Sequence, residues 1–209
     1  RAAHLFDGQR TGQIPAMAAE LLRQAETGVV GKVFEQMQYS PETHLWALTL
    51  PAQHLIHSGR GPIFRDLWAA VGHLCTSEDG RKYEFGAPAL GRLLELAQSK
   101  ADPLLSRFSQ AVERYFINHV FSTPFPFTYI SDHFPLEYHG VLLAEQYAML
   151  RILLGVLAER ENEPEEQRLV RAVVGLSRIT QHTNLGSTAH HFAQEHNLDS
   201  LAYSAYLLR

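Results

Sequence analysis

The scarcest residue in this sequence is cysteine, and its scarcity excludes several kinds of site. The 209 residues include a single cysteine, Cys75. A disulfide joins two cysteines, so none can form within this sequence. Zinc and iron–sulfur centres that are held by cysteine need several thiolates, which one residue cannot supply. Cys75 lies in an apolar helical pattern, which favours a small residue of the core.

Several functional motifs are absent as well. The sequence has no run of five basic residues, and its formal net charge is −4 with histidine neutral. We therefore expect no nucleic acid among its partners. It contains no glycine-rich phosphate loop, no G-x-S-x-G nucleophile elbow and no signal peptide. Because its first residue is Arg1 rather than methionine, we expect a fragment of a longer protein.

Histidine, in contrast, is abundant, with 12 residues in the chain. The densest cluster consists of His190, His191 and His196. This cluster lacks the glutamate and the i,i+4 spacing of a zinc-protease helix. We expect these histidines to lie at the surface, and we predict no metal site.

Apolar residues make up 45% of the sequence, which is enough for a substantial core in one large domain. Their spacing is helical along most of the chain, and no strand–helix–strand alternation occurs. We predict an all-α fold, a bundle of about nine helices in a single domain over 1–209. A division into 1–100 and 101–209 is the alternative. A short strand at Tyr83–Phe85 has no obvious partner.

The bundle is predicted to surround one central helix over about 138–160. From Val141 to Ala158 the strongly polar residues are Glu145, Gln146 and Arg151. A helix that is apolar on nearly every face is typical of a core. Its length would also suit a membrane span. The polar residues inside it and the polar flanks argue against a span, so we expect no membrane partner.

One face of this central helix combines small residues with a cation. The small residues recur at helical spacings, at Gly140, Ala144, Ala148 and Gly155. Arg151 lies on the same side, and Tyr147 borders it. A buried guanidinium stays charged and needs a carboxylate, carbonyl groups or an anionic ligand. Two interpretations of Arg151 stay open, an ion pair between helices and a contact to a ligand.

Three further segments carry polar groups. Asp102-Pro103 is a helix start signal, and the helix is predicted to run to Phe121. The segment 122–138 is rich in aromatic residues and places them near Asp132 and Glu137. Aromatic rings beside carboxylates suit a lysine side chain, although packing as a cap over the bundle is the alternative. The helix that starts at Pro164 places Arg171, Gly175, Arg178 and His182 on one face, which is either solvated or an anion-binding strip.

Four motifs, in order along the chain, resemble those of the flagellin lysine N-methylases. They are Val112–Phe121 with Phe125-Pro126-Phe127, Gln146–Arg151 with Gly155–Ala158, Leu176–Ile179 with His182 and Asn184, and Asn197–Tyr203. The resemblance covers about residues 110–209. The first hundred residues are similar only in their helical, leucine-rich character. Gln146 departs from the family pattern, which has arginine there, and Gln181 replaces an acidic residue.

The resemblance implies an enzyme that transfers methyl groups from S-adenosylmethionine to lysines of flagellin, its partner, in the cytoplasm. An iron–sulfur cluster is implied only for an N-terminal cysteine-rich part that this sequence does not contain. This chain would then supply substrate recognition and part of the pocket. The alternative function is a non-catalytic all-α module that binds a ligand or a partner.

Lysine methylation sets a chemical requirement for the site. A lysine amine, with a pKa of roughly 10.4, must lose a proton before it attacks a methyl donor in a polar displacement. A radical route would not need that step, and both routes stay open. The candidate catalytic residues are Glu113, Tyr129, Asp132 and Glu137. The residues expected to contact the cofactor are Tyr147, Arg151, Arg178 and His182.

Overall fold

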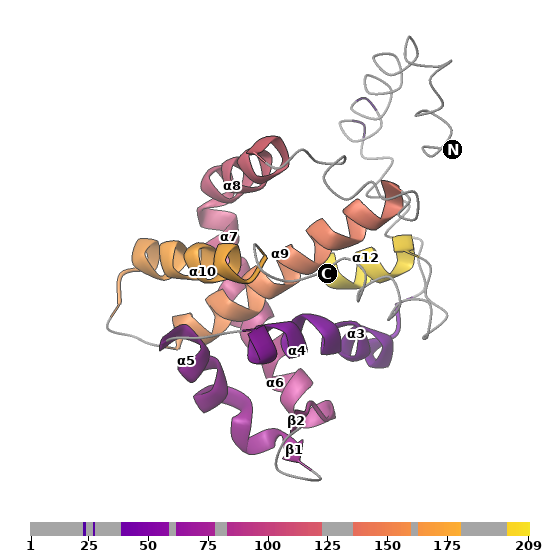
Figure 1. Ribbon diagram of the computed structural model, residues 1–209, viewed down its shortest axis with the longest axis vertical. Coiled ribbons are helices and arrows are strands. Elements are labelled where there is room, and N and C mark those ends of the chain that lie inside the picture. Colours follow the sequence, from indigo (N-terminus) through magenta and orange to yellow (C-terminus); the bar gives the residue numbers. More distant parts are fainter. Residues whose placement is uncertain are drawn as a thin grey trace.

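Helices form nearly all of the described chain (Figure 1). The structure, a computed structural model, describes residues 39–58, 62–77, 83–122, 136–159, 163–180 and 200–209, together with Arg23 and Thr27. The α-helices are α3 (Pro41–Ala47), α4 (Thr49–Ser58), α5 (Pro62–Val71), α6 (Ala87–Leu96), α7 (Asp102–Arg107), α8 (Ser109–Ser122), α9 (Leu136–Ala158), α10 (Glu165–Thr180) and α12 (Ser200–Leu208). A 3₁₀ turn follows α5, and a π-helical turn, η4 (Ala97–Ala101), joins α6 to α7. The predicted all-α fold is confirmed.

One small β-ladder interrupts the helices. The strands β1 (Thr76–Ser77) and β2 (Tyr83–Glu84) pair antiparallel, with Thr76 opposite Glu84 and Ser77 opposite Tyr83. The strand predicted at Tyr83 therefore has a partner, which the sequence pattern did not reveal. Two residues are too few to show the alternation that identifies a strand.

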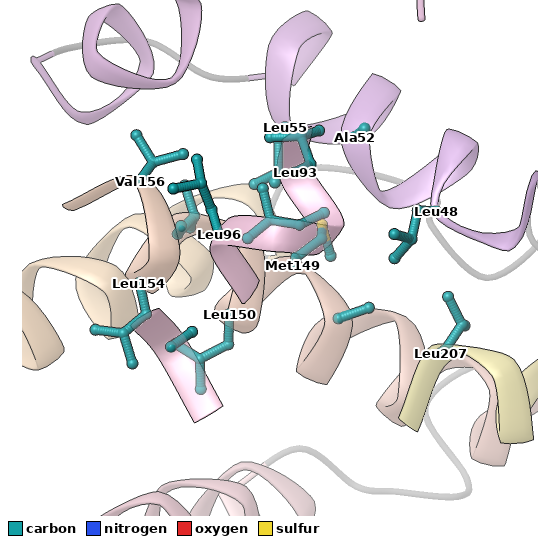
Figure 2. Packing of buried hydrophobic residues seen from close by; sticks show 14 of the residues in the cluster. Leu48, Ala52, Leu55, Leu93, Leu96, Met149, Leu150, Leu154, Val156 and Leu207 are labelled. Carbon is teal, nitrogen blue, oxygen red and sulfur yellow. The ribbon is translucent and has the colours of Figure 1, made fainter. Parts of the chain in front are cut away.

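The central helix is α9, and its bounds agree with those predicted from the sequence. Its residues Met149, Leu150, Leu153, Leu154 and Leu157 are fully buried. Figure 2 shows Met149, Leu150, Leu154 and Val156 of α9 among Leu93 and Leu96 of α6 and Leu48, Ala52 and Leu55 from the α3–α4 region. Burial of one such side chain stabilises a fold by roughly 1.5–3 kcal/mol, so α9 supplies a large part of the hydrophobic core.

Helices surround α9 along its length. It contacts α12, α10, η4, α5, α4 and α6, and Figure 1 shows it crossing the middle of the fold between α10 and α12. The stretch Gly140–Ala158 is long and apolar enough to cross a membrane, yet 83% of it is buried inside the fold. That burial is typical of the core helix of a globular protein.

A buried polar contact attaches α12 to α9. The hydroxyl of Tyr203 donates to Oε1 of Glu145 over 2.8 Å, and both side chains are fully buried. Burial raises the pKa of Tyr203, and the neighbouring Glu145 carboxylate raises it further, so the phenol keeps its proton. A charged-group hydrogen bond of this kind contributes about 1.5–3 kcal/mol, and it fixes the first half of α12 against α9.

The face of α9 that carries the small residues allows another backbone to approach closely at Gly155. A Cβ atom on Gly155 would lie 2.8 Å from both the carbonyl carbon and oxygen of Leu96 and 3.1 Å from the nitrogen of Ala97. Those atoms belong to the junction of α6 and η4. Gly155 therefore lets the junction lie directly against α9, and the turn that follows carries Asp102 toward Arg151.

The helix α7 begins at Asp102-Pro103, as predicted, but the expectation that Asp102 is its N-cap is wrong. Asp102 has helical dihedral angles, φ −59° and ψ −40°, and its N–H donates to the carbonyl of Ala97 in the wider π pattern. The chain thus stays helical from α6 through η4 into α7, and Asp102 is not an N-cap. The extra residue of a π turn lets Pro103, which has no N–H, enter a continuing helix.

The single helix predicted from Asp102 to Phe121 is also two helices. The chain departs from helical geometry at Phe108, with φ −103° and ψ 25°, so α7 ends there and α8 begins at Ser109. The break separates the direction of α8 from that of α7, as Figure 1 shows.

We predict that Gly155→Ala destabilises the fold by roughly 1–3 kcal/mol, because the new methyl group meets backbone atoms that cannot rotate away. Urea unfolding gives the free energy directly. The matched control is Gly140→Ala in the same helix, where a Cβ would meet nothing within 4 Å. This control should be neutral or stabilising by about 0.5–1 kcal/mol, because alanine favours a helix. Equal effects of the two changes would contradict the close approach at Gly155.

Candidate functional site

A cleft lies where α7, α8, α9 and the C-terminal end of α12 come together. Its volume is ≈ 490 Å³, within the range of roughly 300–1,000 Å³ that is usual for ligand sites. Its polar or aromatic lining residues are Asp102, Ser106, Ser109, Glu113, Phe116, Tyr147, Arg151 and Arg209. Three residues predicted from the sequence, Glu113, Tyr147 and Arg151, therefore share one cavity.

Arg151 is buried, with 2% of its surface exposed, and its charge is matched by Asp102. Nε donates to Oδ1 of Asp102 over 2.8 Å, and Nη2 donates to Oδ2 over 2.7 Å. Nη2 also donates to the backbone carbonyl of Arg209 over 3.1 Å. Of the two interpretations of Arg151, the structure shows the ion pair between helices. A contact to a ligand stays a prediction.

The Asp102 side chain is the exposed half of that pair. Its side chain is 38% exposed, against 3% for Arg151. One carboxylate thus satisfies the buried guanidinium and also faces the cleft. The two charges cancel at close range, so the guanidinium offers the cleft little positive charge.

Aromatic rings stand next to the ion pair. The rings of Phe116 in α8 and Tyr147 in α9 lie 6.1 Å apart between centroids. Burial raises the pKa of Tyr147, with Arg151 lowering it and Asp102 raising it to a smaller extent. The phenol is therefore neutral near pH 7 and can donate or accept a hydrogen bond.

Glu113 supplies the second carboxylate of the cleft. It lies in α8 four residues before Ile117 and three before Phe116, and its side chain is exposed. Among the described residues no cation pairs with Glu113. Since Arg151 already balances the Asp102 charge, Glu113 places a further negative charge on the α8 wall of the cleft, which favours a cationic ligand there.

Contacts to α10 hold in place α7 and α8, the two helices on one side of the cleft. The hydroxyl groups of Tyr115 in α8 and Ser177 in α10 lie 3.2 Å apart, and Arg107 in α7 forms an ion pair with Glu165 in α10. Burial raises the pKa of Tyr115, which keeps this phenol protonated. Both ends of the α7–α8 break are thereby fixed to the same neighbouring helix.

The other predicted site residues do not line this cleft or cannot be placed. Arg178 is exposed on α10 and is not part of the lining. Glu137 lies in the first turn of α9, but its side chain is outside the described part. Tyr129, Asp132 and His182 lie outside the described residues, as does the cluster His190, His191 and His196. Their predicted roles remain predictions.

Sequence reasoning missed Asp102, Phe116 and the Arg209 carbonyl as parts of the site. The Asp102-Pro103 pair has a local interpretation as a helix start, which conceals that the Asp102 carboxylate is the partner that a buried arginine on the central helix requires. Phe116 gave no separate signal, since it continued an apolar stripe. The Arg209 carbonyl is a backbone group and has no signature in side chains.

An aromatic cluster lies behind Arg151, on elements α3 and α12. His44 is 1% exposed, and its Nδ1 lies 3.0 Å from the hydroxyl of Tyr39. The Arg209 guanidinium lies 5.0 Å from the centre of the Tyr39 ring. Burial lowers the pKa of His44 to about 4, and the positive charges of Arg151 and Arg209 add to this effect. The imidazole is therefore neutral near pH 7.

Comparison with known proteins identifies a family. The chain matches the family described as the FliB lysine N-methylase C-terminal domain over residues 1–207. The match includes the first hundred residues, where the sequence motifs gave only a helical resemblance. A search of curated proteins found no match, and neither did a search of solved structures.

We predict that the neutral His44 makes stability depend on pH. Its pKa is lower in the folded state, about 4, than the 6.5 of an exposed histidine. The unfolded chain therefore binds the proton more tightly than the folded chain. The neutral His44 makes its full contribution to the free energy of unfolding above the pKa of the unfolded chain, about 6.5, and this contribution is lost as pH falls from there to about 4. The loss amounts to roughly 3 kcal/mol at most.

The measurement is urea unfolding at several pH values for the wild type, His44→Phe and His73→Gln. His44→Phe keeps a ring but cannot titrate, so its stability should fall less steeply with acid. His73 is exposed, and its replacement should leave the full pH dependence. Identical slopes for the wild type and His44→Phe would show that His44 does not carry the effect.

Proposed function

The chain belongs to the FliB lysine N-methylase C-terminal domain family, and we propose that it forms part of an enzyme that methylates lysines of flagellin with S-adenosylmethionine. The family match over residues 1–207 supports this proposal most directly. Flagellin is exported after its synthesis, so we also propose that the reaction takes place in the cytoplasm.

Within this function, the cleft receives the acceptor lysine. A lysine has a flexible apolar stem and an ammonium group. An aromatic ring that packs on the stem and a carboxylate near the ammonium group together bind such a side chain well. Phe116 provides such a face in the cleft, and Glu113 provides the carboxylate one turn away on the same helix. A cation over an aromatic ring gains about 0.5–2 kcal/mol.

Tyr147 and Asp102 form the part of the lining that would hold the methyl donor. When bound, S-adenosylmethionine supplies a methyl group on a positively charged sulfur. The neutral Tyr147 ring, which lies beside the Phe116 ring, suits such a cationic group, and Asp102 lines the same cleft with its charge matched by Arg151. Arg151 then acts through Asp102, whose two oxygens it orients.

The protonation states of the chain's own groups define what each can do. A carboxylate is a much weaker base than a lysine amine, whose pKa is roughly 10.4, and so it is a poor acceptor for the lysine proton. Glu113 is therefore suited to bind and orient the ammonium form. The Glu113 charge raises the pKa of the bound amine, whereas desolvation lowers it, so the proton is released to water once the amine leaves Glu113 for the less polar part of the lining.

We predict that Glu113→Gln in the full-length protein lowers kcat/KM for flagellin methylation roughly tenfold, since the lost charge corresponds to about 1.4 kcal/mol. Mass spectrometry of purified flagellin with S-adenosylmethionine measures the rate of methyl incorporation. Glu113 is exposed, so the folded state should be unaffected. Thermal unfolding of each variant checks this point.

The matched control is Glu166→Gln, which removes the same charge from an exposed position in the first turn of α10, away from the cleft. Its activity should equal that of the wild type. Equal rates for Glu113→Gln and Glu166→Gln would remove Glu113 from the site. Lack of methylation by the wild type under all conditions would contradict the function itself.

A further inference from the structure

One exposed apolar side chain lines the charged cleft, and a second lies on the adjoining surface of α8. Among the described residues, the large hydrophobic side chains with the greatest exposure are Tyr39, Trp46, Ile117, Val170, Val174 and Leu208. Leu208, 45% exposed, is itself part of the cleft lining. Ile117, 44% exposed, lies one helical turn beyond Glu113 on α8. The cleft and the adjoining surface of α8 thus combine the Glu113 carboxylate with exposed apolar side chains from two separate helices.

This combination differs from an ordinary exposed hydrophobic residue. Single apolar side chains on a surface are common and need no partner. Here, however, Leu208 is the last residue of α12, a helix fixed against α9 by the Tyr203–Glu145 hydrogen bond and, next to Leu208, by the bond from Arg151 to the Arg209 carbonyl. The surface is preorganised and lies within reach of the same ligand as Glu113.

We propose that the cleft recognises the acceptor lysine together with an apolar side chain close to it in the same substrate chain. This inference rests on the proposed function and names the class of substrate segment. The occupant is a protein segment, because one such chain can supply both groups. The lysine charge complements Glu113, and the apolar side chain next to the lysine covers Leu208 and Ile117. Segments in which the lysine has only polar neighbours leave that apolar surface in water and bind more weakly.

Peptide binding to the full-length protein tests the inference separately from catalysis. Two fluorescent peptides carry the same central lysine, flanked by leucine in one and by serine in the other, and fluorescence anisotropy gives the Kd of each. The wild type should bind the leucine peptide about three- to tenfold more tightly. In Leu208→Ser and in Ile117→Ser the preference should shrink toward one, while the Kd of the serine peptide changes little.

Val170→Ser is the matched control, because Val170 is 61% exposed but lies on α10 outside the cleft. It should keep the full preference. The inference is overturned if the wild type does not prefer the leucine peptide, if the preference survives in both Leu208→Ser and Ile117→Ser, or if Val170→Ser removes it equally. Flagellin methylation by the wild type is measured in parallel. Its absence counts against the proposed function, whereas the ratio of peptide affinities decides the role of Ile117 and Leu208.

Discussion

The ion pair between Arg151 and Asp102 determines how the parts of the candidate site are arranged. A guanidinium on the most buried helix of the fold cannot lose its charge, so the surrounding chain must supply a carboxylate. Asp102 does so through two hydrogen bonds from the side of α7, and the Arg209 carbonyl adds a third from the end of α12. Three elements far apart in sequence are thus joined at one side chain, and their meeting point is the base of the cleft.

The pair depends in turn on backbone geometry that brings α6 and α7 to α9. Gly155 permits contact with the backbone at Leu96 and Ala97, and the π turn then advances the chain by one extra residue before Asp102. A regular helix would present a different residue to Arg151. π turns occur often at functional sites, and here the turn places a carboxylate where it serves both the buried arginine and the cleft.

Much of this arrangement follows from sequence patterns, and the rest depends on contacts that patterns do not encode. The largely apolar run from Val141 to Ala158 predicts α9, and the small residues at helical spacing on the side of Arg151 include Gly155, where the backbone of the α6–η4 junction approaches α9. The partner itself was not predictable, because Asp102-Pro103 has a strong local interpretation as a helix start that tertiary contacts override. The cleft was only partly predictable for a related reason. Glu113, Tyr147 and Leu208 are distant in sequence, and only the break at Phe108 and the attachment of α12 bring their helices together.

The account predicts an asymmetry that a double-mutant cycle on Asp102 and Arg151 tests directly, with the free energy of unfolding measured in urea. Asp102→Asn leaves a buried charge without its partner and should cost about 3 kcal/mol, whereas Arg151→Met leaves a carboxylate that water can reach and should cost less. The coupling free energy between the two positions should reach about 2 kcal/mol. Additive effects, with a coupling below about 0.5 kcal/mol, would contradict the claim that this ion pair holds the cleft together.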